Sequence, residues 1–89
     1  PGQIINALAA GLKGDIAVEN GDNAKAATLF ESAAAVSDND FTAPMYLRKA
    51  ALAYRALGNT AKADELLKTI TEKYPASYDS TQAERYLTE

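Results

Sequence analysis

The sequence contains neither cysteine nor histidine. Without cysteine the chain can form no disulfide and has no thiolate chemistry, and the cellular compartment is left open. Without histidine it lacks the commonest general base and the commonest metal ligand of proteins. We therefore expect no cofactor and no metal site.

Blocks of like charge and long apolar runs are missing as well. Acidic and basic residues are interspersed, and the net charge is −3, whereas nucleic-acid binding requires a clustered positive surface. No apolar stretch approaches the roughly 18–20 residues that are needed to span a bilayer. We expect neither a nucleic-acid partner nor direct membrane insertion by this chain.

The sequence also has no long run of the β-branched and aromatic residues that favour strands. It is rich in alanine, the residue of highest helix propensity, and this composition predicts an all-α protein. Its 89 residues allow one small domain, which we place at residues 3–88. The chain begins with Pro1-Gly2 and not with methionine, and the simplest interpretation is a processed or trimmed fragment from which a targeting segment can have been removed.

Apolar residues that recur three and four positions apart predict five helices. Gly21 ends the first helix, and Asp22 can cap the second. Pro44 fits the first turn of a helix, whereas Pro75 ends one. The expected helices span residues 3–20, 23–36, 44–57 and 60–74, and a last helix runs from Ser77 or Ser80 to residue 87.

Two local features carry packing expectations. The polar segment from Ser37 to Asp40 breaks the chain between the second and third helices, and Phe41 beside it is expected to pack onto the core. Gly11 and Gly14 lie inside the first helix, where each costs up to about 1 kcal/mol relative to alanine. We expect another helix to approach the first one closely at these glycines.

The same helical pattern occurs twice, in positions whose residue numbers differ by 37. When Gly21 is placed on Gly58, both copies read as helix, short turn with glycine, and helix. The matched positions are Ala24-Lys25-Ala26 with Ala61-Lys62-Ala63, Leu29 with Leu66, Phe30 with Leu67, and Ala33 with Ile70. Self-similarity of this length is typical of helical repeat proteins.

The repeated pattern resembles the tetratricopeptide repeat, a helical hairpin with small residues at the helix crossing, glycine at the turn and proline at the end. The second copy carries the pattern at Leu47, Ala51, Tyr54, Gly58, Ala63, Leu67, Ile70 and Pro75. The first copy carries it at Ala10, Gly14, Ala17, Gly21, Ala26, Phe30, Ala33 and Asp38, so it lacks the aromatic residue and the proline. The usual period is about 34 residues, and the extra length here falls in the loop of residues 37–43.

The resemblance implies repeats at about 7–40 and 44–75, a capping helix at about 77–88, and a right-handed α-solenoid. It further implies a non-catalytic protein–protein interaction module that binds a peptide or partner protein in a concave groove. The residues expected to line this groove are Met45, Arg48, Leu52, Arg55, Asp15 and Glu19.

Within the groove, Met45 and Leu52 would supply apolar contact, and Arg48 and Arg55 would orient acidic groups of the partner. The alternative is that both arginines only solvate a helix face and pair with acidic residues of the preceding repeat. The acidic pair of Asp15 and Glu19 has neither a nucleophile nor metal ligands beside it, so we predict that the protein is not an enzyme.

The stripe of Ile4, Leu8 and Leu12 on the first helix suggests a second function. Terminal repeats of a solenoid need polar outer faces, and this end has no obvious polar cap. Either an upstream repeat covers the stripe, or two chains cover each other as a homodimer, or the stripe packs on the chain's own second helix. In the second case the protein would be an assembly element of a longer envelope protein that acts mainly through its N-terminal edge.

A narrower likeness concerns the segments A-P-M-Y-L at 43–47 and K-Y-P-A-S at 73–77. These segments are similar to bacterial cell-envelope tetratricopeptide proteins, in particular to the C-terminal part of membrane-anchored ones associated with the secretion translocon and periplasmic chaperones. This likeness implies a periplasmic or cell-envelope location in a membrane-anchored parent protein, with the cytoplasm as the alternative.

Overall fold

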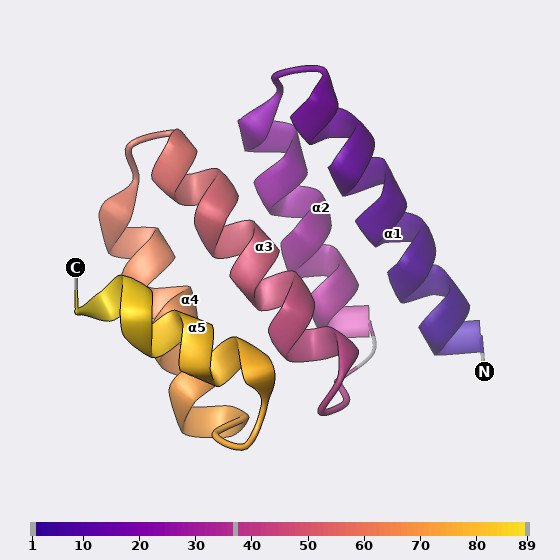
Figure 1. The fold of residues 1–89 in the computed structure, drawn as a ribbon. Helices are drawn as coiled ribbons and strands as arrows, with labels where there is room; N and C mark the ends of the chain where they lie inside the picture. Colours follow the sequence, from indigo (N-terminus) through magenta and orange to yellow (C-terminus); the bar gives the residue numbers. More distant parts are fainter. Residues whose placement is uncertain (1, 37, 89) are drawn as a thin grey trace.

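The computed structural model describes residues 2–36 and 38–88, so Ser37 of the expected loop lies outside the described residues. The described residues form five helices and no strand (Figure 1), which confirms the all-α prediction. The helices are α1 (Gly2–Glu19), α2 (Asn23–Val36), α3 (Thr42–Ala56), α4 (Thr60–Lys73) and α5 (Tyr78–Leu87).

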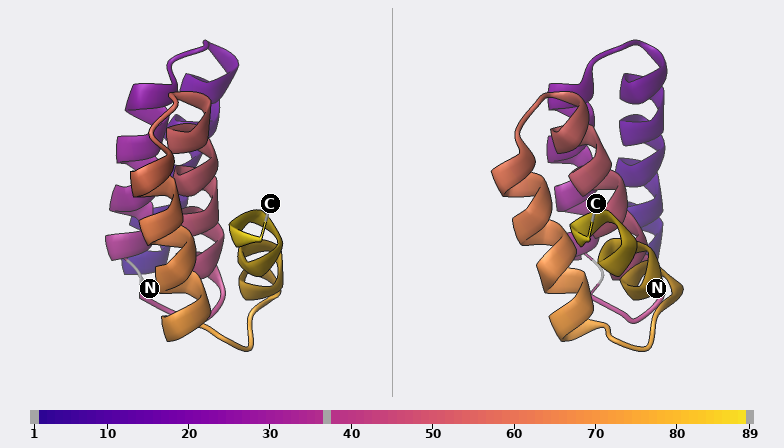
Figure 2. Two further views of the ribbon diagram at one scale, coloured as in Figure 1. Left: turned by 90° about the vertical axis from the view of Figure 1, so that its left-hand side faces the viewer. Right: turned by 60° about the vertical axis from the view of Figure 1, so that its left-hand side comes forward.

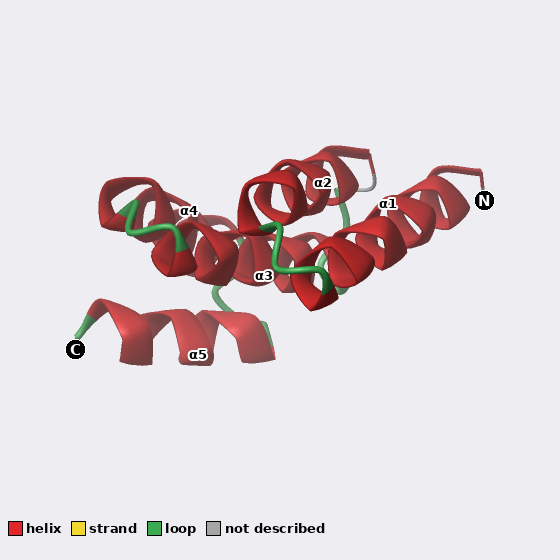
Figure 3. Cartoon of the chain, turned by 90° about the horizontal axis from the view of Figure 1, so that it is seen from above, coloured by secondary structure: helices red, strands yellow, loops and turns green. Residues whose placement is uncertain are grey.

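The five helices lie in two layers. The hairpins α1–α2 and α3–α4 stand side by side, and α5 packs against α4 and α3 (Figure 2). Seen from above, α1, α3 and α5 lie on one side and α2 and α4 on the other (Figure 3). The Cα positions span 34 × 29 × 15 Å, and the short dimension is that expected for two layers of helices about 8–10 Å apart. The chain is thus a short piece of helical solenoid.

Both hairpins turn in the same way. Gly21 and Gly58 have φ angles of 78° and 81°, in the left-handed region where a side chain would be strained. The next residue caps the following helix: the side chains of Asp22 and Asn59 each accept a hydrogen bond of 3.1 Å from the backbone N–H three residues further on. The repeated glycine-plus-cap pattern of the sequence is therefore a repeated structural turn.

The connection from α4 to α5 follows the expected signals. The helix ends at Lys73, and Tyr74 has φ −130°, outside the helical region, directly before Pro75. The hydroxyl group of Ser77 then caps α5 by accepting a 3.0 Å hydrogen bond from the N–H of Ser80. The helix boundaries here come from local chemistry that the sequence displays.

The expectation that Phe41 packs onto the core is wrong, because this residue is 87 % exposed. The side-chain oxygen of Asn39 accepts hydrogen bonds from the backbone N–H groups of Phe41 and Thr42 at 2.9 and 2.8 Å. This local hydrogen bonding starts α3 two residues earlier than expected, and the phenyl ring is left in solvent.

The core is built largely of alanine, with a few large side chains between the helices. Phe30, Leu67 and Ile70 are among the largest fully buried residues. A Cβ atom on Gly14 would lie 2.6 Å from Cε1 of Phe30, and one on Gly11 would overlap the ring of Tyr46. Both glycines are therefore sites of close approach, as expected.

The apolar face of α1 is the principal departure from expectation. The helix buries only small residues, namely Ala7, Gly11, Gly14 and Ala17. Its large apolar residues Ile4, Leu8 and Leu12 are 49, 50 and 62 % exposed. The alternative that this stripe packs on the second helix is wrong, because the rings from α2 and α3 require small residues on the face of α1 that meets them.

Candidate protein-binding groove

A groove of about 640 Å³ lies between α1 and α3 and reaches down to α2. Its apolar lining combines the buried residues Phe30 and Ala53 with more exposed apolar residues, and its charged residues come from the last turns of α1 and the middle of α3. The lining residues are Asp15, Val18, Glu19, Asn23, Phe30, Lys49, Leu52, Ala53 and Ala56.

Three of the six residues expected in the groove, Asp15, Glu19 and Leu52, do line it. Leu52 is half-buried and has the small residues Ala53 and Ala56 beside it on α3. Small residues at these positions leave room for another backbone or a bulky side chain to approach the floor closely. This arrangement gives the groove an apolar floor with charged residues at its edges.

Lys49 is the groove residue that sequence reasoning missed. Its ammonium group lies 2.9 Å from Oδ1 of Asp15, so an ion pair bridges α3 and α1 across the groove. The same ammonium group lies 5.5 Å from the centre of the Phe30 ring, within the range of a cation–π interaction. Helical spacing could have identified it, because residues 49, 52 and 56 share one face.

Arg48 and Arg55 face α5. Nε of Arg48 lies 2.7 Å from Oδ1 of Asp79, and the two side chains are only 24 and 11 % exposed. The guanidinium carbon of Arg55 lies 5.1 Å from the centre of the Tyr86 ring. These contacts hold the last helix against α3, in place of the pairing with Asp15 or Glu19 that was the alternative interpretation of the arginines.

Met45 and Glu19, the other two residues expected in the groove, differ in their surroundings. Met45 is partly buried and packs against the core. The carboxylate of Glu19, by contrast, is exposed and has no ion pair or hydrogen bond with any other described residue. Of the two acidic groups in the groove, Asp15 is thus neutralised by the chain itself and Glu19 is open to a partner.

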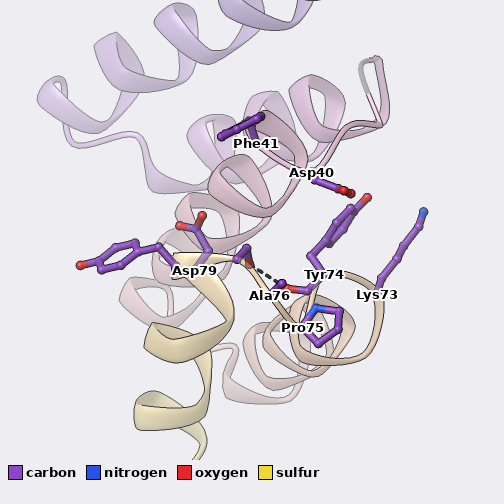
Figure 4. A pocket seen from close by; sticks show the side chains of 9 residues that line it. Asp40, Phe41, Lys73, Tyr74, Pro75, Ala76 and Asp79 are labelled. Carbon is purple, nitrogen blue, oxygen red and sulfur yellow. Dashed lines mark hydrogen bonds between the residues drawn. The ribbon is translucent and has the colours of Figure 1, made fainter.

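A second hollow, of about 390 Å³, lies where α3 begins and α4 passes into α5 (Figure 4). At its edge the hydroxyl of Tyr74 donates a hydrogen bond to the carboxylate of Asp38, and Nζ of Lys73 lies 3.0 Å from Oδ2 of the same carboxylate. The hydrogen bonds from Tyr74 and then Lys73 hold the pKa of Asp38 below its usual value. The cluster joins the loop between the repeats to the end of α4, which is a structural role.

A similar link joins the first hairpin to the turn end of the second. The hydroxyl of Tyr54 donates a hydrogen bond to the carboxylate of Glu31, and this bond, with burial, raises the pKa of Tyr54 to about 12. Nζ of Lys62 lies 3.7 Å from the same carboxylate. Side chains from α2, α3 and α4 therefore meet at one acidic group, which fixes the second hairpin against the first.

Within residues 2–36 and 38–88 no three acidic side chains gather in a way that could hold a metal ion. None of the described helices has the length and apolarity required to cross a membrane.

Comparison with known families agrees with the geometry. The model of the tetratricopeptide repeat family matches residues 46–77, which cover most of α3, all of α4 and the connection to α5. This match supports a tetratricopeptide-repeat protein, although it spans only the second of the two hairpins. Repeats of this family generally mediate protein–protein interactions. Neither the curated proteins nor the solved structures include a significant match to the chain.

Proposed function

We propose that the protein is a non-catalytic interaction module that binds a peptide segment of another protein in the groove between α1 and α3. The observation that carries this proposal is the apolar groove itself, with half-buried Leu52 on its wall and, at its edge, the carboxylate of Glu19, which is not paired with any other residue that the structure describes. A pocket with an apolar floor and a few polar groups is the usual form of a binding site.

The charges of the groove define the chemistry of the ligand. Glu19 attracts a cation, whereas Asp15 is already compensated by Lys49. Arg48 uses one of its five N–H donors on Asp79, and it and Arg55 contribute only secondary contacts to acidic groups at the side nearest α5. The ligand we propose is an apolar segment with lysine or arginine placed toward Glu19, bound as a helix or an extended strand.

Two synthetic peptides test this assignment. One is an amphipathic helical peptide of leucine, alanine and lysine, and the other has glutamate in place of every lysine. We expect the lysine peptide to bind in fluorescence anisotropy with a dissociation constant on the order of 10–100 µM, a range typical of small and wet interfaces. Its affinity should fall as salt is added, because the interaction with Glu19 is exposed to solvent.

The variants Leu52→Lys and Glu19→Gln locate the binding. Leu52→Lys should abolish binding of the lysine peptide, and Glu19→Gln should weaken it by a few-fold, about what a solvent-exposed ion pair provides. Leu57→Lys is the matched control, because Leu57 is 47 % exposed and does not line the groove. Equal binding of both peptides, or full binding by Leu52→Lys, would refute the proposed site.

For the parent protein we propose a cell-envelope location, which rests only on the similarity of the segments at 43–47 and 73–77 to membrane-anchored envelope proteins of the translocon-associated type. Fractionation of cells that express the parent protein tests this location. Recovery in the cytoplasmic fraction would refute it.

A further inference from the structure

The N-terminal edge of the solenoid carries a second surface, formed by exposed apolar residues of α1. It consists of five large apolar residues whose exposure ranges from 49 to 66 %: Ile4, Ile5, Leu8, Leu12 and Ile16. We call this surface the α1 edge. It borders the groove, because residues 8, 12, 15 and 19 follow one another at intervals of four and three and so share one side of the helix with the Asp15 and Glu19 carboxylates.

We propose that the α1 edge is the interface of a homodimer, in which two copies of the chain pair through antiparallel α1 helices. Four of the five residues, at positions 4, 8, 12 and 16, follow one another at intervals of four. Residues four apart form a ridge on a helix, and two such ridges interlock in the commonest class of helix packing, at an angle of about −50°. The edge therefore has the shape needed to pack against itself.

The area of the α1 edge also fits a second copy. The five side chains present roughly 500 Å² of apolar surface, which is near the upper end for the largest patch of a monomer. Two such patches would bury roughly 1,000 Å², the lower limit for a specific interface. A dimer of this size should dissociate with a constant on the order of 10–100 µM.

Burial within the chain explains why α1 benefits from a partner. The residues that it packs against its own chain are alanine and glycine, which remove little apolar surface from water. The two internal glycines also lower its helix propensity by about 1 kcal/mol each. Covering the large residues of the opposite face would therefore add much of the burial that α1 lacks.

Charge favours the antiparallel arrangement. Residues 2–12 of α1 carry no charge, and Lys13, Asp15 and Glu19 follow in its C-terminal part. A parallel pair would bring the two Asp15 carboxylates together beside the ridge, which is unfavourable. In an antiparallel pair that crosses between Leu8 and Leu12, each Leu8 meets Leu12 of the other copy, and the two carboxylates lie at opposite ends.

Light scattering coupled to size-exclusion chromatography tests the dimer over about 10 µM to 1 mM, a range that brackets the expected constant. The mass of the unmodified chain should rise from 9.4 kDa toward twice that value. Leu12→Lys should raise the dissociation constant at least about tenfold, so at each concentration its mass should stay well below that of the unmodified chain. Leu57→Lys places the same charge on a leucine of 47 % exposure outside the α1 edge, and it should dimerise like the unmodified chain.

Cysteine cross-linking tests the direction of the helices, because the chain has no cysteine of its own. A mixture of Leu8→Cys and Leu12→Cys chains should form a disulfide-linked dimer under mild oxidation, whereas each variant alone should link poorly, since the two Cα atoms must lie within about 7 Å. A mass of 9.4 kDa at every concentration would overturn the proposal, as would a mass that grows beyond two chains or efficient linking of each variant with itself. Leu52→Lys, which tests the groove, leaves the α1 edge intact, so failure of one site is distinguishable from failure of the other.

Discussion

Replacement of Gly14 by alanine tests the packing on which both surfaces depend. The added Cβ would lie 2.6, 2.8 and 3.0 Å from three atoms of the Phe30 ring, and that ring is only 2 % exposed. Because these distances are too short for carbon atoms in contact, the ring or α1 must shift, and overpacking of this kind costs about 1–3 kcal/mol. Alanine returns up to about 1 kcal/mol of helix propensity, so the net loss should be about 1–2 kcal/mol.

The measurement is urea unfolding followed by circular dichroism, at one fixed protein concentration because self-association changes apparent stability. A loss of about 1–2 kcal/mol corresponds to a decrease in Tm of roughly 5–15 °C for a domain of this size. The Gly14→Ala substitution should become stabilising, by about 0.5–1 kcal/mol, in a Phe30→Leu background that removes the ring. Gly2→Ala, where no atom lies within 4 Å, is the control. Stabilisation by Gly14→Ala in the unmodified background would refute the close contact.

Three further predictions concern the links between the helices. Arg48→Ala leaves the buried Asp79 without its cation, so hydrogen exchange should accelerate throughout α5 while α1 and α2 keep their protection. Uniform acceleration would contradict this role. Because the pKa of Tyr54 is raised to about 12 from 10, its hydrogen bond to Glu31 stabilises the fold below pH 10, and this contribution is lost as the pH rises toward 12. The variant Tyr54→Phe should therefore lose less stability between pH 10 and 12 than the unmodified chain. An identical loss would be evidence against the bond. Because the pKa of Asp38 is lowered from 3.8, the carboxylate stabilises the fold above pH 3.8, and this stabilisation is lost as the pH falls through the lower pKa of the folded state. Asp38→Asn should therefore make the loss of stability in acid less steep. An unchanged acid-unfolding curve would count against the cluster.

Helix positions, turns and caps could be predicted from the sequence because their causes are local. Gly21 and Gly58 adopt positive φ angles that suit glycine, and Ser77 and Asn59 accept capping hydrogen bonds from residues only three positions away. The segment that matches the tetratricopeptide repeat model begins at residue 46, within the copy that fits the repeat pattern more completely. Interactions between residues three to five positions apart can be recognised in the sequence.

The inner face of α1 could not be predicted in this way, because large apolar residues are normally the buried ones. Here the rings of Phe30 and Tyr46, which stack with their centres 6.5 Å apart, occupy the space beside α1. Gly11 and Gly14 leave room for them, and the large residues of α1 are turned outward. The exposure of these residues depends on side chains from two other helices, so the periodicity of α1 alone does not predict it.

On α3, residues one position further along than expected line the groove, for a related reason: Lys49 and Ala56 line it, and Arg48 and Arg55 do not. Arg48 and Arg55 lie one position before Lys49 and Ala56, and one residue rotates a side chain by about 100° around a helix. The position of α5, fixed by the bond from Arg48 to Asp79, decides which of these faces remains open. The sequence predicts the helix α5 but does not indicate which face of α3 this helix covers.

The two ends of the solenoid differ, and this difference has a consequence for assembly. The C-terminal helix α5 exposes Thr81, Glu84 and Arg85, a polar surface suited to a terminal cap, whereas the opposite end exposes the α1 edge. If the apolar end packs against an identical end, the polar caps lie at the outside of the pair and further growth stops, as expected for an isologous contact with twofold symmetry. A contact between the apolar end of one chain and the polar end of the next would instead leave one apolar edge uncovered in every assembly. The homodimer that we propose therefore leaves polar surfaces at both of its ends.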